Sequence, residues 1–300
     1  MNGKMEIRWI VLFGWLGMVG AVLGAGSVPN FVASSYSRVV MTTDLYSELT
    51  NLTLSVWVKT ATRPESGNYS AIAGRGYLGA MNGFGLFLCG DDGKIYFQTR
   101  TGNAIVAAGT AYPFDGAWHH VAGVRDGNTT RLYLDGKRVD ETTGDLSSLY
   151  SPGIAFGLGA RNESGGWGFC YTGAMAEVRL WNCARTESEL QLDMFRRLTG
   201  SENGLVGYWP LNEGSGSLIV DQMPAGNGGE CNSIVWSADP SFGDMLSATN
   251  AYAGYWPLAL KLADCDTHDT RLTDSNTVEV TGLSVPDGYT HFQIGTSGVA

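Results

Sequence analysis

The sequence has little charge and little proline for its length. Of 300 residues, 16% are charged and 9 are proline, while 44% are hydrophobic. Disordered chains show the opposite balance, so this class is excluded. Acidic residues outnumber basic ones by 29 to 19, which gives a formal net charge of −10. Nucleic-acid-binding proteins need a basic face, so we expect no nucleic-acid partner.

Cysteine is also scarce, and its spacing is not that of a zinc site. No two cysteines form a Cys-x-x-Cys pair. An odd number leaves at least one without a disulfide partner in the same chain, and the spacing does not assign the pairs. The five cysteines are Cys89, Cys170, Cys183, Cys231 and Cys265.

Motifs for catalysis are missing or lie in the wrong context. The Gly74–Gly79 stretch fits Gly-x-Gly-x-x-Gly but lies among strand patterns, so we interpret it as a glycine-rich turn rather than a dinucleotide site. His119 and His120 are neighbours on a predicted strand and point to opposite faces, which disfavours a shared metal ion. Glu177 stands alone on its predicted strand, whereas a glycosidase needs two facing carboxylates. There is no Gly-x-Ser-x-Gly motif. We therefore expect no enzymatic activity.

The amino terminus has the pattern of a secretory signal. Lys4 and Arg8 precede an apolar stretch that runs to about Leu23, and the small residues 24–26 offer a cleavage site. The alternative is an uncleaved membrane anchor, for which the stretch is short. We expect residues 1–26 to be removed and the protein to be secreted, with the cell surface or the periplasm as possible locations. No membrane span would remain after removal.

Glycine and aromatic residues are abundant, with 42 Gly, 9 Trp, 13 Tyr and 11 Phe. The stretch 51–60 alternates between apolar and other residues, which is the period of a β-strand. Turns are indicated at residues 91–93, 126–127 and 135–136, each of which contains Asp-Gly. Strands and turns at this spacing predict an all-β sandwich.

One helix is expected. Thr186 and Glu189 form a capping-box pattern, which satisfies free amide groups at a helix start. Leu190, Met194 and Leu198 follow at a spacing of four residues, so we expect the helix to end near Leu198, with Gly200 just beyond it.

Several of these segments together resemble a known family. In order and spacing, residues 30–200 resemble the LamG-like jelly roll, which is a concanavalin A-like sandwich. The resemblance is carried by LTLSVWVKT (52–60), GFGLFL (83–88), DGAWHHVAGVRDG (115–127), RLYLDGKRV (131–139) and GAMAEVRLWNCARTESEL (173–190). It implies two antiparallel sheets and one short helix, in a domain of residues 27–240. The family's Ile-Asp-Glu step is Met175-Ala176-Glu177 here, so any role of that aspartate is absent.

The carboxyl-terminal third adds two further expectations. Residues 204–236, which begin GLVGYWPLNEGSGS, resemble a stretch that commonly opens a jelly roll. We predict that 205–211 folds back and completes the same sandwich, because a missing strand would expose an edge. Residues 241–300 are expected to be a linker and a partial immunoglobulin-like β segment, with strand patterns at 277–280 and 288–298. This ending favours a fragment of a longer protein.

Sugar recognition needs aromatic surfaces and planar polar groups. The polar loop 161–167 supplies Arg161, Asn162 and Trp167 between two predicted strands, and we expect Tyr77 to join them, with Tyr171 nearby. The alternative is a Trp167 that packs against the sheet. Four Asn-x-Ser/Thr sequons predict surface positions if the host glycosylates. They begin at Asn51, Asn68, Asn128 and Asn162.

Calcium is the metal that the sequence favours most. Asp221 and Asn227, with the glycines beside Asn227, can supply the oxygen ligands that Ca²⁺ requires. A side-chain-capped turn without an ion explains the same residues equally well. A second acidic cluster is a weaker candidate, since it lacks the glycine and the final glutamate of an EF-hand loop. It consists of Asp264, Asp266, His268 and Asp269.

Taken together, the sequence predicts a secreted binding module that recognises an extracellular glycan or mediates adhesion, with possible assistance from Ca²⁺. Two alternatives stay open. One is an interaction module for a surface protein, and the other is the targeting domain of a larger secreted glycoside hydrolase. The fold alone does not name the ligand.

Overall fold

A computed structural model describes residues 27–41, 49–76, 82–144, 149, 154–163, 166–224, 226–239, 241–242, 269–274 and 277–281. The chain divides into two compact units, residues 24–251 and the remainder, and each is treated by itself. The predictions for residues 1–26, 288–298 and most of the second acidic cluster fall outside the described residues. Within the described ranges, no helix has the length and apolar character to cross a membrane.

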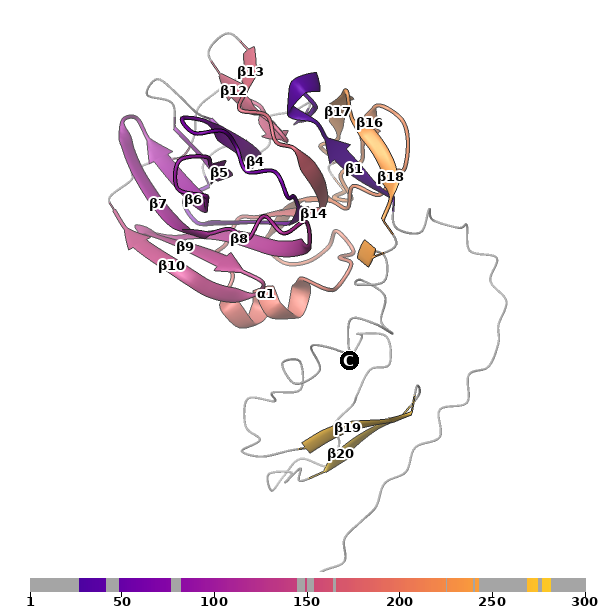
Figure 1. Cartoon of the computed structure of the whole chain (residues 1–300). Helices are drawn as coiled ribbons and strands as arrows, with labels where there is room; N and C mark the ends of the chain where they lie inside the picture. Colours follow the sequence, from indigo (N-terminus) through magenta and orange to yellow (C-terminus); the bar gives the residue numbers. More distant parts are fainter. Residues whose placement is uncertain are drawn as a thin grey trace, which may run out of the picture. The chain divides into compact units, whose positions relative to one another are not determined.

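The large unit contains two antiparallel sheets (Figure 1). The first sheet has the order β10-β9-β8-β3-β14-β1-β18, and β15 also pairs with β14. Its strands are β1 (Ser27–Phe31), β3 (Leu52–Lys59), β8 (Trp118–Asp126), β9 (Thr129–Leu134), β10 (Lys137–Thr143), β14 (Gly173–Trp181), β15 (Leu205–Trp209) and β18 (Val235–Ala238).

The second sheet has the order β16-β17-β2-β11-β4-β5-β6-β7. Its strands are β2 (Arg38–Met41), β4 (Tyr69–Arg75), β5 (Gly83–Cys89), β6 (Lys94–Thr101), β7 (Ala104–Ala111), β11 (Phe156–Leu158), β16 (Leu218–Ile219) and β17 (Gly229–Asn232). A short hairpin of β12 (Arg161–Glu163) and β13 (Gly166–Gly168) and a 3₁₀ turn at Ala33–Ser35 complete the unit. The two-sheet antiparallel sandwich is therefore as predicted.

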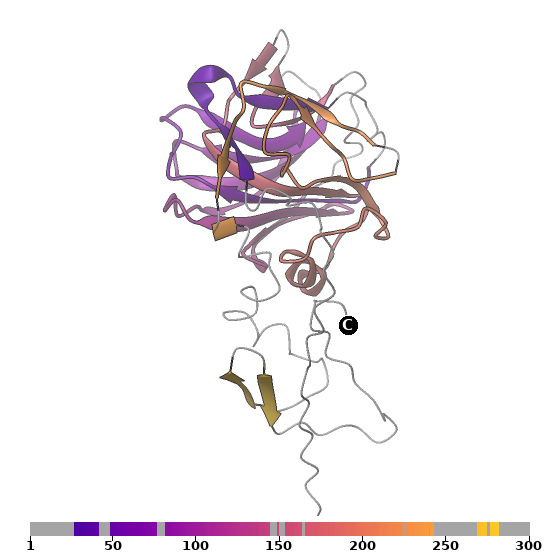
Figure 2. The same cartoon turned by 90° about the vertical axis from the view of Figure 1, so that its right-hand side faces the viewer.

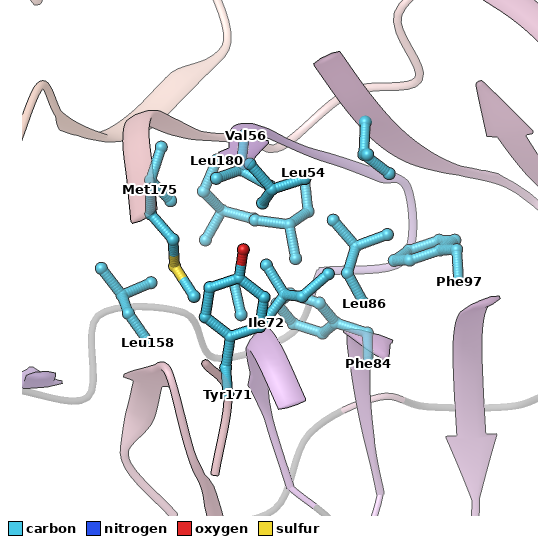
Figure 3. Packing of buried hydrophobic residues seen from close by; sticks show 14 of the residues in the cluster. Leu54, Val56, Ile72, Phe84, Leu86, Phe97, Leu158, Tyr171, Met175 and Leu180 are labelled. Atoms are coloured by element: carbon cyan, nitrogen blue, oxygen red, sulfur yellow. The ribbon is translucent and has the colours of Figure 1, made fainter. Parts of the chain in front are cut away.

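The core lies between the sheets. Leu54 and Val56 of β3 point into it from the first sheet, and Ile72 and Leu86 point into it from the second (Figure 3). Their alternation with outward-facing residues follows the strand period, as the stretch 51–60 predicted. Tyr171 is fully buried in this core and donates its hydroxyl proton to the carbonyl groups of Lys59 and Ala174. The expectation that Tyr171 lies at a ligand site is therefore wrong.

Three predicted hairpins are present where Asp-Gly turns marked them. They join β5 to β6, β8 to β9 and β9 to β10. The stretch 205–211 supplies β15, which pairs with β14 in the first sheet. The residues after it return to both sheets, because β16 and β17 extend the second sheet while β18 extends the first.

The helix α1 (Glu187–Asp193) begins at the predicted capping box but ends earlier than predicted. Thr186 and Glu189 cap its first turn reciprocally. Instead of continuing to Leu198, the helix stops because Arg179 of β14 donates to the carbonyl oxygens of Asp193 and Arg196, which further helical turns would use. Gly200 therefore has no role at the helix end. In both views α1 lies on the side of the first sheet away from the second (Figure 1, Figure 2).

The described part of the other unit is a hairpin of β19 (Asp269–Asp274) and β20 (Thr277–Thr281). The strand expected at 277–280 lies within β20. Its assignment to an immunoglobulin-like fold stays a prediction.

Candidate functional site

The chain itself covers the outer face of the first sheet. Residues 182–204, which include α1, pack along this face, where Leu190 contacts Tyr133 and the indole of Trp57 donates to the carbonyl of Met194 at 2.8 Å. Phe242 packs on Trp57 beside them. A ligand on the central strands of this sheet would have to displace that cover.

The outer face of the second sheet is the remaining broad surface. Strand register aligns Gly157 of β11 with Gly74 of β4, Gly74 with Gly85 of β5, and Gly85 with Gln98 of β6. Their neighbours along each strand are buried, and most of them belong to the core cluster, so these residues face outward. Three adjacent strands therefore present backbone without side chains, and we call Gly157, Gly74 and Gly85 the glycine row.

Aromatic rings border the glycine row. Trp167 of β13 lies against Gly157, where an added Cβ would be 2.5 Å from its Cζ3 atom, and its side chain stays half-buried. The ring of Phe87 leans over Gly85, where an added Cβ would be 2.7 Å from Cζ. Tyr96, level with Phe87 on the next strand, is also partly exposed. Trp167 and Phe87 occupy the space that Gly157 and Gly85 leave open. Phe87 is itself buried, so Trp167 and Tyr96 are the rings that this face exposes.

The polar groups of this face that concern a ligand lie on β6, beside the glycine row. The Tyr96 hydroxyl donates to Asp92. Burial and this hydrogen bond raise the pKa of Tyr96 above its ordinary value, so the phenol is neutral. Gln98 stands in line with the glycine row, and Arg100 is the next outward residue on the same strand; both are partly exposed. Exposed aromatic rings with amide, phenol and guanidinium groups beside them can contact both the faces and the hydroxyls of a sugar.

The predicted ligand residues fall into different places. Trp167 lies on the outer face of the second sheet, opposite the partly buried Asn162 in the β12–β13 hairpin. Arg161 is only 6% exposed, and its guanidinium carbon lies 3.8 Å from the centre of the Phe169 ring, so it supports the hairpin. Tyr77 lies outside the described residues. The glycine row was missed, because register brings together glycines that are far apart in the sequence.

The oxygen atoms at the predicted calcium site already accept hydrogen bonds from the chain. Oδ1 of Asp221 accepts hydrogen bonds from the amides of Tyr208 and Met223, and Oδ2 accepts one from Asn227. The carbonyl of Asn227 in turn accepts from the indole of Trp209. Burial raises the pKa of Asp221, while the three amide donors oppose that rise. Both carboxylate oxygens therefore hold a buried turn, which was the alternative to a calcium site in the sequence analysis. Ca²⁺ binding here stays a prediction.

The histidine pair serves the two sides of its strand, as expected. His119 lies between Asp135, 2.8 Å from Nδ1, and Asp115, 3.3 Å from Nε2. His120 is buried on the other side against Trp57, and burial together with the charge of Arg179 lowers its pKa to about 3. The described residues contain no group of three or more His, Cys, Asp or Glu side chains that could hold a metal ion.

Glu177 is not the isolated residue that its sequence neighbours suggested. It lies at a β-bulge of β14 with a positive φ of 54°, and its Oε2 is 2.8 Å from both Arg179 Nη2 and the Tyr208 hydroxyl. Burial and the Glu177 charge raise the pKa of Tyr208. The sequence analysis missed this pair, which the i, i+2 spacing of Glu177 and Arg179 on one strand could have indicated. Its location under α1 makes it structural.

The four described cysteines are free: Cys89, Cys170, Cys183 and Cys231.

A shallow pocket of ≈ 350 Å³ lies where β3 and β18 end and β14 begins. Its charged groups are already paired, since Lys59 Nζ is 2.8 Å from Asp239 Oδ2 and the Trp118 indole donates to the same oxygen. We therefore assign no ligand to this pocket.

Comparisons with known proteins agree on the fold. A family model described as the concanavalin A-like lectin/glucanases superfamily matches residues 33–191. No curated protein sequence matches the chain. Among solved structures, a Bacteroides ovatus protein whose suggested role is carbohydrate binding superposes with a TM-score of 0.57 at 19% identity, over 71% of this chain and 60% of that protein. The chain thus spans less than two thirds of that protein's length.

Two further structures are more distant. A heptameric SAP-like pentraxin from Limulus polyphemus gives a TM-score of 0.49 at 13% identity, with 73% of this chain and 98% of that one covered. The CBM40 domain of the Ruminococcus gnavus IT-sialidase gives 0.41 at 15% identity, with 48% and 82% covered.

Proposed function

Because this chain belongs to the concanavalin A-like lectin/glucanases superfamily, we propose that it is a non-catalytic carbohydrate-binding module. The ligand lies on the outer face of the second sheet, along the glycine row. The observation that carries the proposal is Trp167, a half-buried indole seated on Gly157 at one end of that row. The covered outer face of the first sheet supports the same choice.

The face suits a sugar ring for a physical reason. Pyranose rings have an apolar C–H face that packs on aromatic rings, and hydroxyl groups that need planar hydrogen-bonding partners. Trp167 and Tyr96 supply the rings, and Gln98 and Arg100 supply the polar groups. The absence of a Cβ at Gly157 lets the Trp167 indole lie directly against the sheet, where a sugar ring can stack on it.

Binding without hydrolysis fits the carboxylates of this face. A glycosidase holds two carboxyl groups about 5–10 Å apart. Asp92, just before β6, accepts hydrogen bonds from Tyr96 and the Lys94 amide. Glu230 lies on β17, five strands away in the sheet order, which corresponds to roughly 20 Å or more at strand spacing.

The proposed setting is extracellular. The signal-like pattern of residues 1–26 supports export, and a glycan or adhesion partner outside the cell follows from it. A protein partner on a cell surface and a targeting role within a larger hydrolase are the alternatives that a binding test separates from this one.

A glycan array with the full chain tests the proposal. Wild type is expected to bind at least one glycan, and Trp167→Ala is expected to lose that binding by about tenfold or more. Trp236→Ala is the matched control, because Trp236 is also half-buried but lies on β18 of the first sheet. Equal binding by the two variants, at equal melting temperature, would reject this face. Release of reducing sugar from a bound glycan would reject the non-catalytic assignment.

Calcium assistance is tested in the same assay. Binding and the melting temperature are measured in calcium chloride and in EDTA, for wild type and Asp221→Asn. A calcium-dependent rise that this substitution abolishes would support the sequence-based prediction, and identical values in both buffers would remove it.

A further inference from the structure

We propose that Arg38 makes the binding face selective for a sugar that carries a carboxylate group. The inference rests on the proposed function, since it concerns the same face at the Trp167 end of the glycine row. Nothing in the sequence pattern singles out Arg38, which stands between polar and apolar residues at the start of β2.

Arg38 is placed beside Trp167 by strand geometry. Val39 and Met41 of β2 point into the core, so Arg38 and Val40 point to the outer face. Val40 is aligned with Gly157, and the ring of Trp167 lies against that glycine. The guanidinium carbon of Arg38 lies 5.8 Å from the centre of the Trp167 ring. A charged donor and an indole therefore meet at one end of the face.

The guanidinium group keeps donors that the described residues do not use. Its Nη1 donates to the carbonyl of Tyr36 at 3.0 Å, while Nε is buried without an acceptor. Among the described residues, no carboxylate lies within ion-pair distance of Arg38. In the first sheet, by contrast, Arg131, Arg138 and Arg179 each pair with a carboxylate. A carboxylate on the ligand would accept from Nη2 and from the second N–H of Nη1, in the bidentate geometry that guanidinium favours.

The negative net charge of the chain favours a ligand with few negative charges over a densely charged polymer. The net charge of −10 repels a densely sulfated or phosphorylated polymer, and Glu230 lies on the strand next to Arg38, opposite Val40. A single carboxylate per recognised sugar gains the contact with Arg38 and meets less of this repulsion. A uronic acid and a sialic-type acid both provide that chemistry.

Titration calorimetry with matched ligand pairs tests the inference on the full chain. One pair is an oligogalacturonate and its methyl ester, and the other is sialyllactose and lactose. We expect wild type to bind the acid of one pair at least about tenfold more tightly than its neutral partner, and the pair that shows this identifies the source of the carboxylate. Arg38→Gln is expected to remove the difference, and Arg38→Lys to keep part of it.

Arg138→Gln is the matched control, because Arg138 is an exposed arginine on β10 of the first sheet and should leave both affinities unchanged. Equal affinity for acid and neutral sugars, or an Arg38→Gln variant that keeps the acid preference at an unchanged melting temperature, would overturn the inference. In that case the proposed function still stands if neutral glycans bind. A wild type that binds no glycan on the array would reject both.

Discussion

Replacing Arg179 by methionine tests whether a buried ion pair fastens residues 182–204 over the first sheet. Arg179 and Glu177 are 2% and 1% exposed, and their charged groups are 2.8 Å apart. Arg179 also donates to the carbonyls of Asp193 and Arg196, each at 2.6 Å. The substitution leaves the Glu177 carboxylate buried with Tyr208 as a hydrogen-bonding partner. Loss of one partner of such a pair costs about 3–5 kcal/mol in the free energy of unfolding.

Urea unfolding followed by circular dichroism measures this loss. The double variant Glu177→Gln with Arg179→Met removes both charges, so we expect it to recover part of the stability, because no uncompensated charge stays buried. Arg131→Met is the matched control, since Arg131 forms exposed ion pairs on β9 and should cost far less. A loss no larger than that of the control, or a double variant no more stable than Arg179→Met, would refute the reasoning.

Three further predictions concern single side chains. His120 has a pKa of about 3 in the folded state, against about 6.5 in the unfolded chain. Below pH 6.5 only the unfolded chain gains the proton, so the free energy of unfolding should fall by about 2 kcal/mol between pH 8 and pH 5. His120→Phe should remove this contribution when stability is measured against pH. Gly157→Ala places a methyl group 2.5 Å from the Trp167 ring, so the indole must move and glycan affinity should fall about fivefold or more, whereas Gly166→Ala, with nothing within 4 Å, should not change it. Asp221→Ala leaves three amide groups without their acceptor and should lower the melting temperature by several degrees in EDTA as in calcium; an unchanged melting temperature would show that the turn does not depend on this carboxylate.

Local patterns in the sequence predicted most of the fold. The alternation in residues 51–60 and the Asp-Gly turns fix strands and hairpins because both depend on neighbouring residues. The capping box at Thr186 located the start of α1 for the same reason. Its end was predicted too late, since the carbonyls that stop the helix are held by Arg179, whose position depends on strand pairing.

The candidate site was predicted only in part. A tryptophan in a polar loop pointed to Trp167, but the burial of Arg161 against Phe169 depends on how the β12–β13 hairpin folds back. The glycine row and Arg38 were missed, because only the register of β11, β4 and β5 brings their members together. Asp221 was predicted either to hold a turn or to bind Ca²⁺, and its three amide contacts show the turn.

Hydrogen–deuterium exchange of the full chain, with and without a saturating glycan found on the array, tests most directly where the ligand binds. The account predicts slower exchange in peptides that contain β4 to β6 and residues 161–169, and unchanged exchange in residues 182–204 over the first sheet. Protection confined to residues 182–204, or to the strands of the first sheet, would contradict the claim that the second sheet carries the binding face.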